Sequence, residues 1–184
     1  MADTELVVAL QEWAAVCAAL ATGDIILTVR KGGILDKGGF RPEHRRCLLW
    51  PSREHQDSSR LRPPWSAAAI PAVPAVATTW AELAEVWWLD REAQLAAVAP
   101  CTALSDGELA ARFAYRGRPG LHLVALRVHP LPHPVAFPPE FAAGCRSWIP
   151  LPGRLATGTL PPIVPDPAWS ARLAQVRAAL ESAR

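Results

Sequence analysis

The nine residues LHLVALRVH, Leu121 to His129, carry the clearest strand signal in this 184-residue chain. Polar and apolar residues alternate at one end, and the middle is continuously apolar, as is typical of a β-strand in a packed sheet. A turn at residues 117–120 precedes the run, and the prolines from Pro130 to Pro139 predict a loop after it. This strand is the centre from which the other elements are placed.

Two further strands are predicted before it. Residues 24–29 (DIILTV) are rich in β-branched side chains and apolar at consecutive positions, which indicates burial on both faces. A second short strand, CLLWP, is stopped by Pro51. We expect strands 24–30 and 46–50 to pair as a hairpin with a long tip. Residues 80–89 fit either a helix or a strand, and residues 145–151 are expected to return as a strand.

Helices are predicted at both ends and between the strands. The first is expected over Leu6 to Leu20, where apolar residues recur at helical spacing, and Gly23 ends it. Residues 91–98 look helical, and Ser105 opens a capping box with Glu108. A C-terminal helix over 166–184 has an apolar stripe made of Trp169, Leu173, Val176 and Leu180.

Together these elements predict one α+β domain over residues 1–184, with a mixed sheet or small barrel and N- and C-terminal helices packed on it. A chain of this length buries roughly 70% of its unfolded surface, so it needs no disulfide or metal to fold. Residues 61–79 are rich in proline and alanine and are predicted to be a surface segment. No apolar run is long enough to cross a membrane, and the acidic start is unlike a secretory signal. We therefore expect a cytoplasmic protein without a membrane partner.

The charge of the chain is unevenly distributed. Residues 29–62 hold nine basic and four acidic side chains, a net charge of +5, whereas the whole chain carries only +2. Such a field attracts anions to one region, although a basic face that is merely solvated is the commoner case.

A glycine-rich basic loop lies inside this segment. Arg30-Lys31-Gly32-Gly33 places two cations and two unhindered amides at the end of a predicted strand, which suits an anion with several oxygens. The chain has 17 arginines and two lysines, and both lysines fall in this loop, so an ammonium group is specifically indicated there. The candidate anion-binding residues are Arg30, Lys31, Gly32, Gly33, Lys37, Arg41, His44, Arg45 and Arg46.

Glu54 and His55 are the candidate catalytic pair. An imidazole titrates near neutrality and an adjacent carboxylate can orient it, but His55 could equally bind a backbone carbonyl and fix a turn. His44, Cys47 and His55 could supply three metal ligands, yet the chain lacks the close cysteine pairs of zinc sites, so no metal site is predicted. The sequence leaves any cofactor unknown.

A second basic region could bind single-stranded nucleic acid by stacking. Arg112, Arg116 and Arg118 alternate with Phe113 and Tyr115, although solvated arginines at a strand edge explain the same pattern.

The blocks WAAVCAAL, ILTVRKGGI, HRRCLLWPSREHQ, RFAYRGRPGLHLVALRVHPL and GCRSWIPL follow one another between Trp13 and Leu151. In this order they resemble the bacterial family named domain of unknown function 1802. The family pattern has a threonine where this chain has Ser52 and an aromatic residue where it has Cys47. The resemblance implies which residues matter, but no activity is established for the family.

Three functions remain open from the sequence. The first is a module that binds a phosphate-bearing partner, nucleic acid above all, through Arg30, Lys31, Arg41, Arg45 and Arg46. The second is a hydrolase or phosphotransferase in which Lys31 holds a phosphate and Glu54 and His55 move protons. The third is a subunit that docks a protein partner through exposed tryptophans and proline-rich loops, with the basic loop serving only solubility.

Overall fold

The structure is a computed structural model that describes residues 5–32, 36, 39–52, 54, 56–67 and 76–184. In chain order its elements are β1 (Glu5–Trp13), α1 (Ala14–Thr22), β2 (Leu27–Arg30), β3 (Arg46–Ser52), β4 (Val76–Leu89), α2 (Glu92–Val98), α3 (Asp106–Phe113), β5 (Leu121–Ala136), β6 (Trp148–Ala156) and α4 (Asp166–Ser182). Short 3₁₀ turns lie at Ser58–Arg60, Trp65–Ala67, Ala99–Cys101, Tyr115–Gly117 and Pro139–Ala142.

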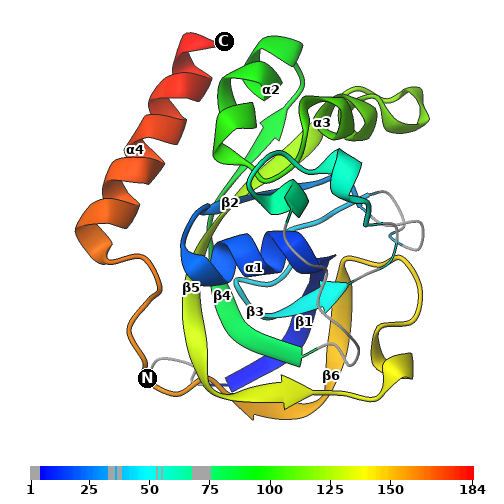
Figure 1. The fold of residues 1–184 in the computed structure, drawn as a ribbon, viewed down its shortest axis with the longest axis vertical. Helices are drawn as coiled ribbons and strands as arrows, with labels where there is room; N and C mark the ends of the chain where they lie inside the picture. Colours follow the sequence, from blue (N-terminus) through cyan, green and yellow to red (C-terminus); the bar gives the residue numbers. More distant parts are fainter. Residues whose placement is uncertain (1–4, 33–35, 37–38, 53, 55, 68–75) are drawn as a thin grey trace.

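The described strands form one mixed sheet in the order β2-β5-β4-β3-β1-β6. β1 and β3 are parallel, and the other neighbours are antiparallel. The sheet is strongly curled, yet β2 and β6 stay at its two edges, so it is open and does not close into a barrel (Figure 1). The predicted α+β class with a mixed sheet is confirmed.

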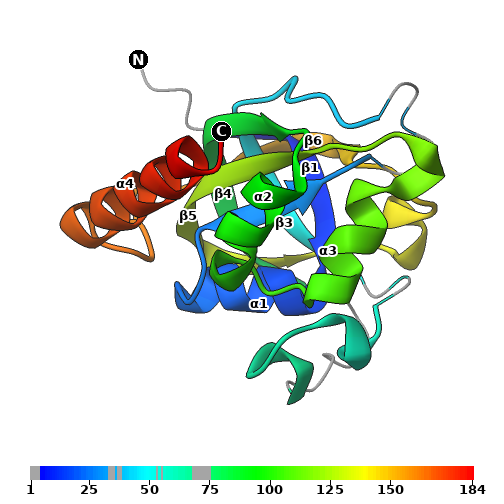
Figure 2. The same ribbon diagram turned by 90° about the horizontal axis from the view of Figure 1, so that it is seen from above.

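The helices cover the sheet from several sides. α2 and α3 lie between β4 and β5 in the chain and sit together at one end of the sheet (Figure 1). α4 runs along the outer side beside β5 and α2, and Figure 2 shows α1 on a different side of the body. The predicted C-terminal helix is confirmed, with Leu173, Val176 and Leu180 buried. Among the described residues, no helix is both long and apolar enough to cross a membrane.

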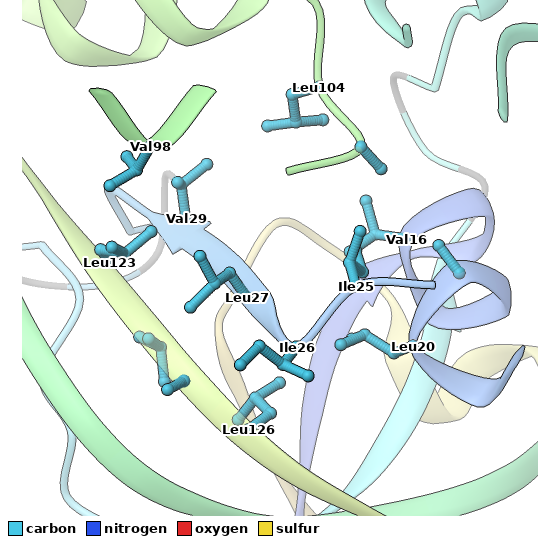
Figure 3. Packing of buried hydrophobic residues seen from close by; sticks show 14 of the residues in the cluster. Val16, Leu20, Ile25, Ile26, Leu27, Val29, Val98, Leu104, Leu123 and Leu126 are labelled. Atoms are coloured by element: carbon cyan, nitrogen blue, oxygen red, sulfur yellow. The ribbon is translucent and has the colours of Figure 1, made fainter. Parts of the chain in front are cut away.

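Buried side chains form one cluster on each face of the sheet. The larger cluster joins the helices to the sheet, and Figure 3 shows Val16 and Leu20 of α1 directed at the segment of Ile25 and Ile26, with Leu126 of β5 nearby. The smaller cluster lies on the other face and includes Leu48 and Trp50 with Phe137 and Phe141 packed against them. Because both faces are covered, apolar residues occupy consecutive positions in several strands.

The predicted N-terminal helix is wrong in its first half. Residues 5–13 form β1, and the helix starts only at Ala14. Leu6 and Ala9 belong to the smaller cluster, whereas Val8 and Leu10 belong to the larger one. A strand that is buried on both faces shows no period of two, so its apolar positions also matched a helical spacing. Gly23 ends α1 as predicted, with φ 75°.

The predicted hairpin between residues 24–30 and 46–50 is also wrong. β2 pairs with β5, and β3 lies between β1 and β4. Both strands exist, but the chain from α1 to β3 serves as the crossover between the parallel strands β1 and β3. Parallel neighbours require such a long connection, and nothing in local sequence shows which strand will be the neighbour.

The predicted loop from Pro130 to Pro139 is wrong in its first part, because β5 continues to Ala136. Leu126 N–H donates to Ile26 O at 2.8 Å, on the side of β5 that faces β2. Pro130 lies four residues further along β5, so its backbone nitrogen faces the same side as the Leu126 N–H. The pairing with β2 has ended before this position, so the N–H that proline lacks costs the sheet no hydrogen bond. The expected surface segment 61–79 is shorter than predicted, because β4 starts at Val76.

Burial predicts a large loss of stability for Leu123→Ala. Leu123 is fully buried where β5 lies between β2 and β4, so truncation should lower the free energy of unfolding by about 2–5 kcal/mol. Leu160→Ala is the matched control, because Leu160 is 44% exposed and should change little. Urea unfolding of both variants followed by circular dichroism measures the difference, and equal effects would contradict the assigned burial.

Candidate functional site

A cleft with a volume of about 420 Å³ opens where the carboxyl ends of β1, β2 and β3 meet α3. Ligand sites of globular proteins usually have volumes of roughly 300–1,000 Å³. Its described lining comes from β1 (Gln11, Glu12, Trp13), β2 and the residues after it (Val29, Arg30, Lys31, Gly32), β3 and the residues after it (Ser52, Glu54), the first 3₁₀ turn (Arg60), α3 (Glu108, Ala111, Arg112), and Tyr115, Cys145 and Arg146.

An ion pair between Glu12 and Arg30 forms the base of the cleft. Arg30 Nη1 lies 3.1 Å from Glu12 Oε2, and the two side chains are only 10% and 2% exposed. Arg30 also donates to Gln11 O at 2.9 Å and, through Nη2, to Ser147 Oγ at 2.8 Å. One guanidinium of the edge strand β2 therefore holds β1 and the segment before β6.

Glu12 is ionised although it is buried. Burial alone raises the pKa of this carboxyl, but the charges of Arg30 and Arg112 and hydrogen bonds from the Thr28 hydroxyl (2.5 Å) and the Trp13 N–H (2.7 Å) outweigh it and lower the pKa below 4.5. Its oxygens are thus fully engaged. The carboxylate organises the site and is a poor candidate for a general base.

Arg112 and Glu108 of α3 form one wall of the cleft. Arg112 Nε donates to Glu108 Oε1 at 2.7 Å, and the guanidinium lies 4.5 Å from the centre of the Trp13 ring. Ser105 caps α3 by accepting from Glu108 N–H at 3.3 Å, as predicted. In a capping box the Glu108 carboxylate would also accept from the Ser105 N–H. Here it forms ion pairs with Arg112 and with Arg60, whose Nη1 lies 3.8 Å from Glu108 Oε2.

Arg146 stands at the rim with its backbone fixed. The backbone N–H of Gln11 donates to Ser147 O at 2.9 Å. The side-chain amide of Gln11 is satisfied when its nitrogen faces the carbonyls, where it donates to Arg146 O at 2.9 Å and Gly144 O at 3.3 Å. Among the described residues, the exposed Arg146 guanidinium has no hydrogen bond or ion pair. It is a cation available to a ligand.

Lys31 uses its ammonium to hold the loop after α3. Nζ donates to Phe113 O at 3.0 Å and also to Arg118 O and Gly120 O. Burial lowers the pKa of this lysine. The three converging carbonyls match the three N–H donors of an ammonium group. A planar guanidinium could not donate to all three carbonyls from one nitrogen. Lys31 lines the cleft as expected, but its N–H groups are directed at the protein.

The other expected anion ligands are dispersed. Gly32 lines the cleft, and its φ of 103° and close approach to Phe40 N exclude a side chain there. Arg41, His44, Arg45 and Arg46 do not line it. His44 packs on Trp148, and Arg46 lies over Trp80 beside Glu82. Gly33 and Lys37 lie outside the described residues.

Of the candidate catalytic pair, Glu54 lines the cleft and is exposed, whereas His55 lies outside the described residues. Cys145 Sγ lies 3.7 Å from Glu54 Oε2, and burial together with this carboxylate raises the pKa of the thiol. Burial raises the pKa of Cys47 to about 12, which makes it a poor metal ligand. The described residues contain no group of three metal-binding side chains.

Sequence reasoning missed three groups that shape the cleft: Glu12, Arg60 and Arg146. Glu12 and Gln11 interrupt the apolar run of residues 6–17, and two polar residues inside a buried segment are a usable signal. Arg146 lies within the block GCRSWIPL, whose sequence predicts a strand and carries part of the family resemblance but does not mark the arginine as a ligand. No feature of the sequence around Arg60 identifies it as a residue of the cleft.

A family model described as a domain of unknown function (DUF1802) matches residues 9–175. The chain belongs to this family. The DUF1802 match covers every described residue that lines the cleft. A comparison with curated proteins found no match.

Solved structures similar to this DUF1802 chain include the crystal structure of ASCH from Zymomonas mobilis, with 13% sequence identity and a TM-score of 0.49 over 91% of this chain and 92% of that chain. Two mutant forms of the Zymomonas protein give TM-scores of 0.49 and 0.48, also at 13% identity, over 92% and 91% of this chain and 94% and 95% of theirs. This likeness carries no information about ligand or chemistry.

Glu12→Gln should destabilise the protein by about 3–5 kcal/mol at pH 7, because it leaves Arg30 buried without its counter-charge. The folded-state pKa of Glu12 is lowered, so its stabilisation is complete above about pH 4.5 and is lost as the pH falls through the folded pKa. The difference between wild type and variant should therefore shrink on acidification.

Urea unfolding of both proteins between pH 7 and pH 3 measures this difference. Glu5→Gln is the control, because the Glu5–Arg154 pair is exposed and is worth at most about 1 kcal/mol. A Glu12→Gln effect as small as that of Glu5→Gln would contradict the structural role of the pair.

Proposed function

We propose that this protein binds single-stranded nucleic acid and that the cleft holds one nucleotide of the strand. The observation that carries the proposal is the excess of cations in the described lining, where Arg30, Lys31, Arg60, Arg112 and Arg146 oppose Glu12, Glu54 and Glu108. A concave surface with fixed cations raises the local concentration of anions. Arg side chains frequently contact phosphate in a forked geometry, with two parallel hydrogen bonds.

Two of these cations are accessible to a phosphate. Arg146 is exposed and unpaired within the described part of the chain. Arg60 is half-exposed, with a long 3.8 Å contact to Glu108 and an electrostatic interaction with Asp57. Arg30 and Arg112 donate their hydrogen bonds to protein groups, so they attract a phosphate through their positive charge without contacting it. We therefore assign the direct phosphate contacts to Arg146 and Arg60.

Tyr115 supports a nucleotide over a simple phosphate ion. Its side chain is 43% exposed at the cleft, and the Arg116 guanidinium lies 5.2 Å from the ring centre. An exposed aromatic ring beside cations is the usual stacking platform for a base of a single strand. A duplex would keep its bases stacked on one another and offer none to the ring.

Replacing Arg146 by Ala should weaken binding of a labelled decanucleotide about tenfold and reduce the salt dependence of binding by about one phosphate contact. Fluorescence polarisation with single-stranded DNA and RNA between 50 and 200 mM salt measures both quantities. Arg154→Ala is the matched control, because Arg154 is also an exposed arginine but does not line the cleft.

No salt-sensitive binding of either strand to the wild-type protein would refute the proposal. Equal losses in Arg146→Ala and Arg154→Ala would also refute the assigned site, because they would indicate a diffuse response to net charge. Thermal unfolding of both variants tests that each remains folded.

The hydrolase or phosphotransferase hypothesis is supported by Glu54, whose carboxylate lies at the same cleft. If His55 and Glu54 move protons, His55→Ala should lower turnover by roughly 100-fold or more and leave nucleic-acid affinity unchanged. Assays of cleavage and phosphate release on bound oligonucleotides test this difference. Absence of turnover in the wild-type protein would leave binding as the function.

A further inference from the structure

Trp88 at the carboxyl end of β4 is an exposed aromatic residue that packing does not explain. It is 50% exposed, and it is the one exposed side chain among the eight tryptophans, all of which lie in the described part of the chain. A single exposed apolar residue is ordinary on a protein surface, so what matters at Trp88 is how the ring is supported and what lies beside it.

The Trp88 ring is held rigidly from below. It lies over the backbone of Gly120, where a Cβ atom would be only 2.2 Å from the ring. His122, its register partner on β5, meets the indole edge-on with ring centres 4.9 Å apart. A rigid aromatic face costs little conformational entropy when a ligand stacks on it.

The loop from Tyr115 to Gly120 connects this platform to the cleft. Tyr115 lines the cleft, Gly120 supports Trp88, and the exposed side chains of Arg116 and Arg118 lie between them in the chain. Tyr115 and Gly120 are five positions apart in the chain, so their Cα atoms are separated by at most about 18 Å. Lys31 fixes the shape of the loop through the carbonyls of Phe113, Arg118 and Gly120.

We propose that Trp88 is a second stacking site for the same nucleic-acid strand, so that a strand seated in the cleft continues over Arg116 and Arg118 and stacks another base on the indole. The inference rests on the proposed function and extends it from one nucleotide to a track of several. Aromatic rings at both ends and cations between them match the alternation of bases and phosphates. Within the described part of the chain, a protein partner would meet the exposed Trp88 ring and, in the adjoining loop, the exposed Arg116 and Arg118.

The test compares short and long ligands on wild type, Trp88→Ala and Tyr115→Ala. A mononucleotide, as the shortest ligand, should fill the cleft only, so Trp88→Ala should change its affinity less than twofold. A decanucleotide reaches both rings, and its affinity should fall about tenfold in Trp88→Ala. Tyr115→Ala should weaken both ligands. Trp88→Phe should restore most of the decanucleotide affinity, because phenylalanine keeps a stacking face.

Leu160→Ala controls for loss of an exposed apolar side chain remote from the cleft lining, and should change neither affinity. Decanucleotide binding that Trp88→Ala leaves unchanged would overturn the second site and leave the cleft intact. Failure of the wild-type protein to bind either ligand would overturn the cleft proposal and this inference with it. A folded Trp88→Phe variant without rescue would also count against stacking.

Discussion

The buried pair of Glu12 and Arg30 is the interaction on which the cleft depends. In an open sheet the two edge strands, here β2 and β6, do not pair with each other. Arg30 of β2 bridges this distance with its side chain, which donates to Gln11 O and Glu12 of β1 and to Ser147 just before β6. A carboxylate that is 2% exposed would be too costly without these partners. The pair therefore fixes the edge strand β2 relative to β1 and the segment before β6, to which no strand pairing joins it.

Two loops take their shape from this arrangement. Ser147 accepts from Arg30 and donates its hydroxyl to Asp36 at 2.5 Å, which ties the segment after β2 to the segment before β6. Arg146 is the adjacent residue, so its backbone is fixed while its side chain stays open to water. On the other side of the cleft, the Lys31 ammonium gathers three carbonyls of the loop that carries Tyr115. The cations nearest the core thus organise the site, and those at the rim are left for a ligand.

Local sequence signals predicted an element correctly where its own residues were enough to specify it. Residues 121–129 formed a strand, Ser105 capped α3, and the stripe of Leu173, Val176 and Leu180 docked α4 on the body. They failed at β1, because burial on both faces removed the period that separates strands from helices. The rarity of lysine predicted that the Lys31 ammonium has a role of its own, as a ligand for an anion. Only the folded loop of residues 113–120 revealed that the groups it meets are the protein's own carbonyls.

The sequence by itself determined the α+β class, most of the strands and helices, and the basic character of the region after β2. These properties follow from composition, spacing and charge, which act over short stretches of chain. Only the tertiary structure decided which strands are neighbours and which cations reach water. Arg146 and Arg60 join the cleft from segments more than 80 residues apart, whereas Arg41 and Arg45, much closer to Arg30 in the chain, do not line it. The reason is that sheet order and the ionic contacts at its edges are set by burial of the whole core, a balance that no local pattern encodes.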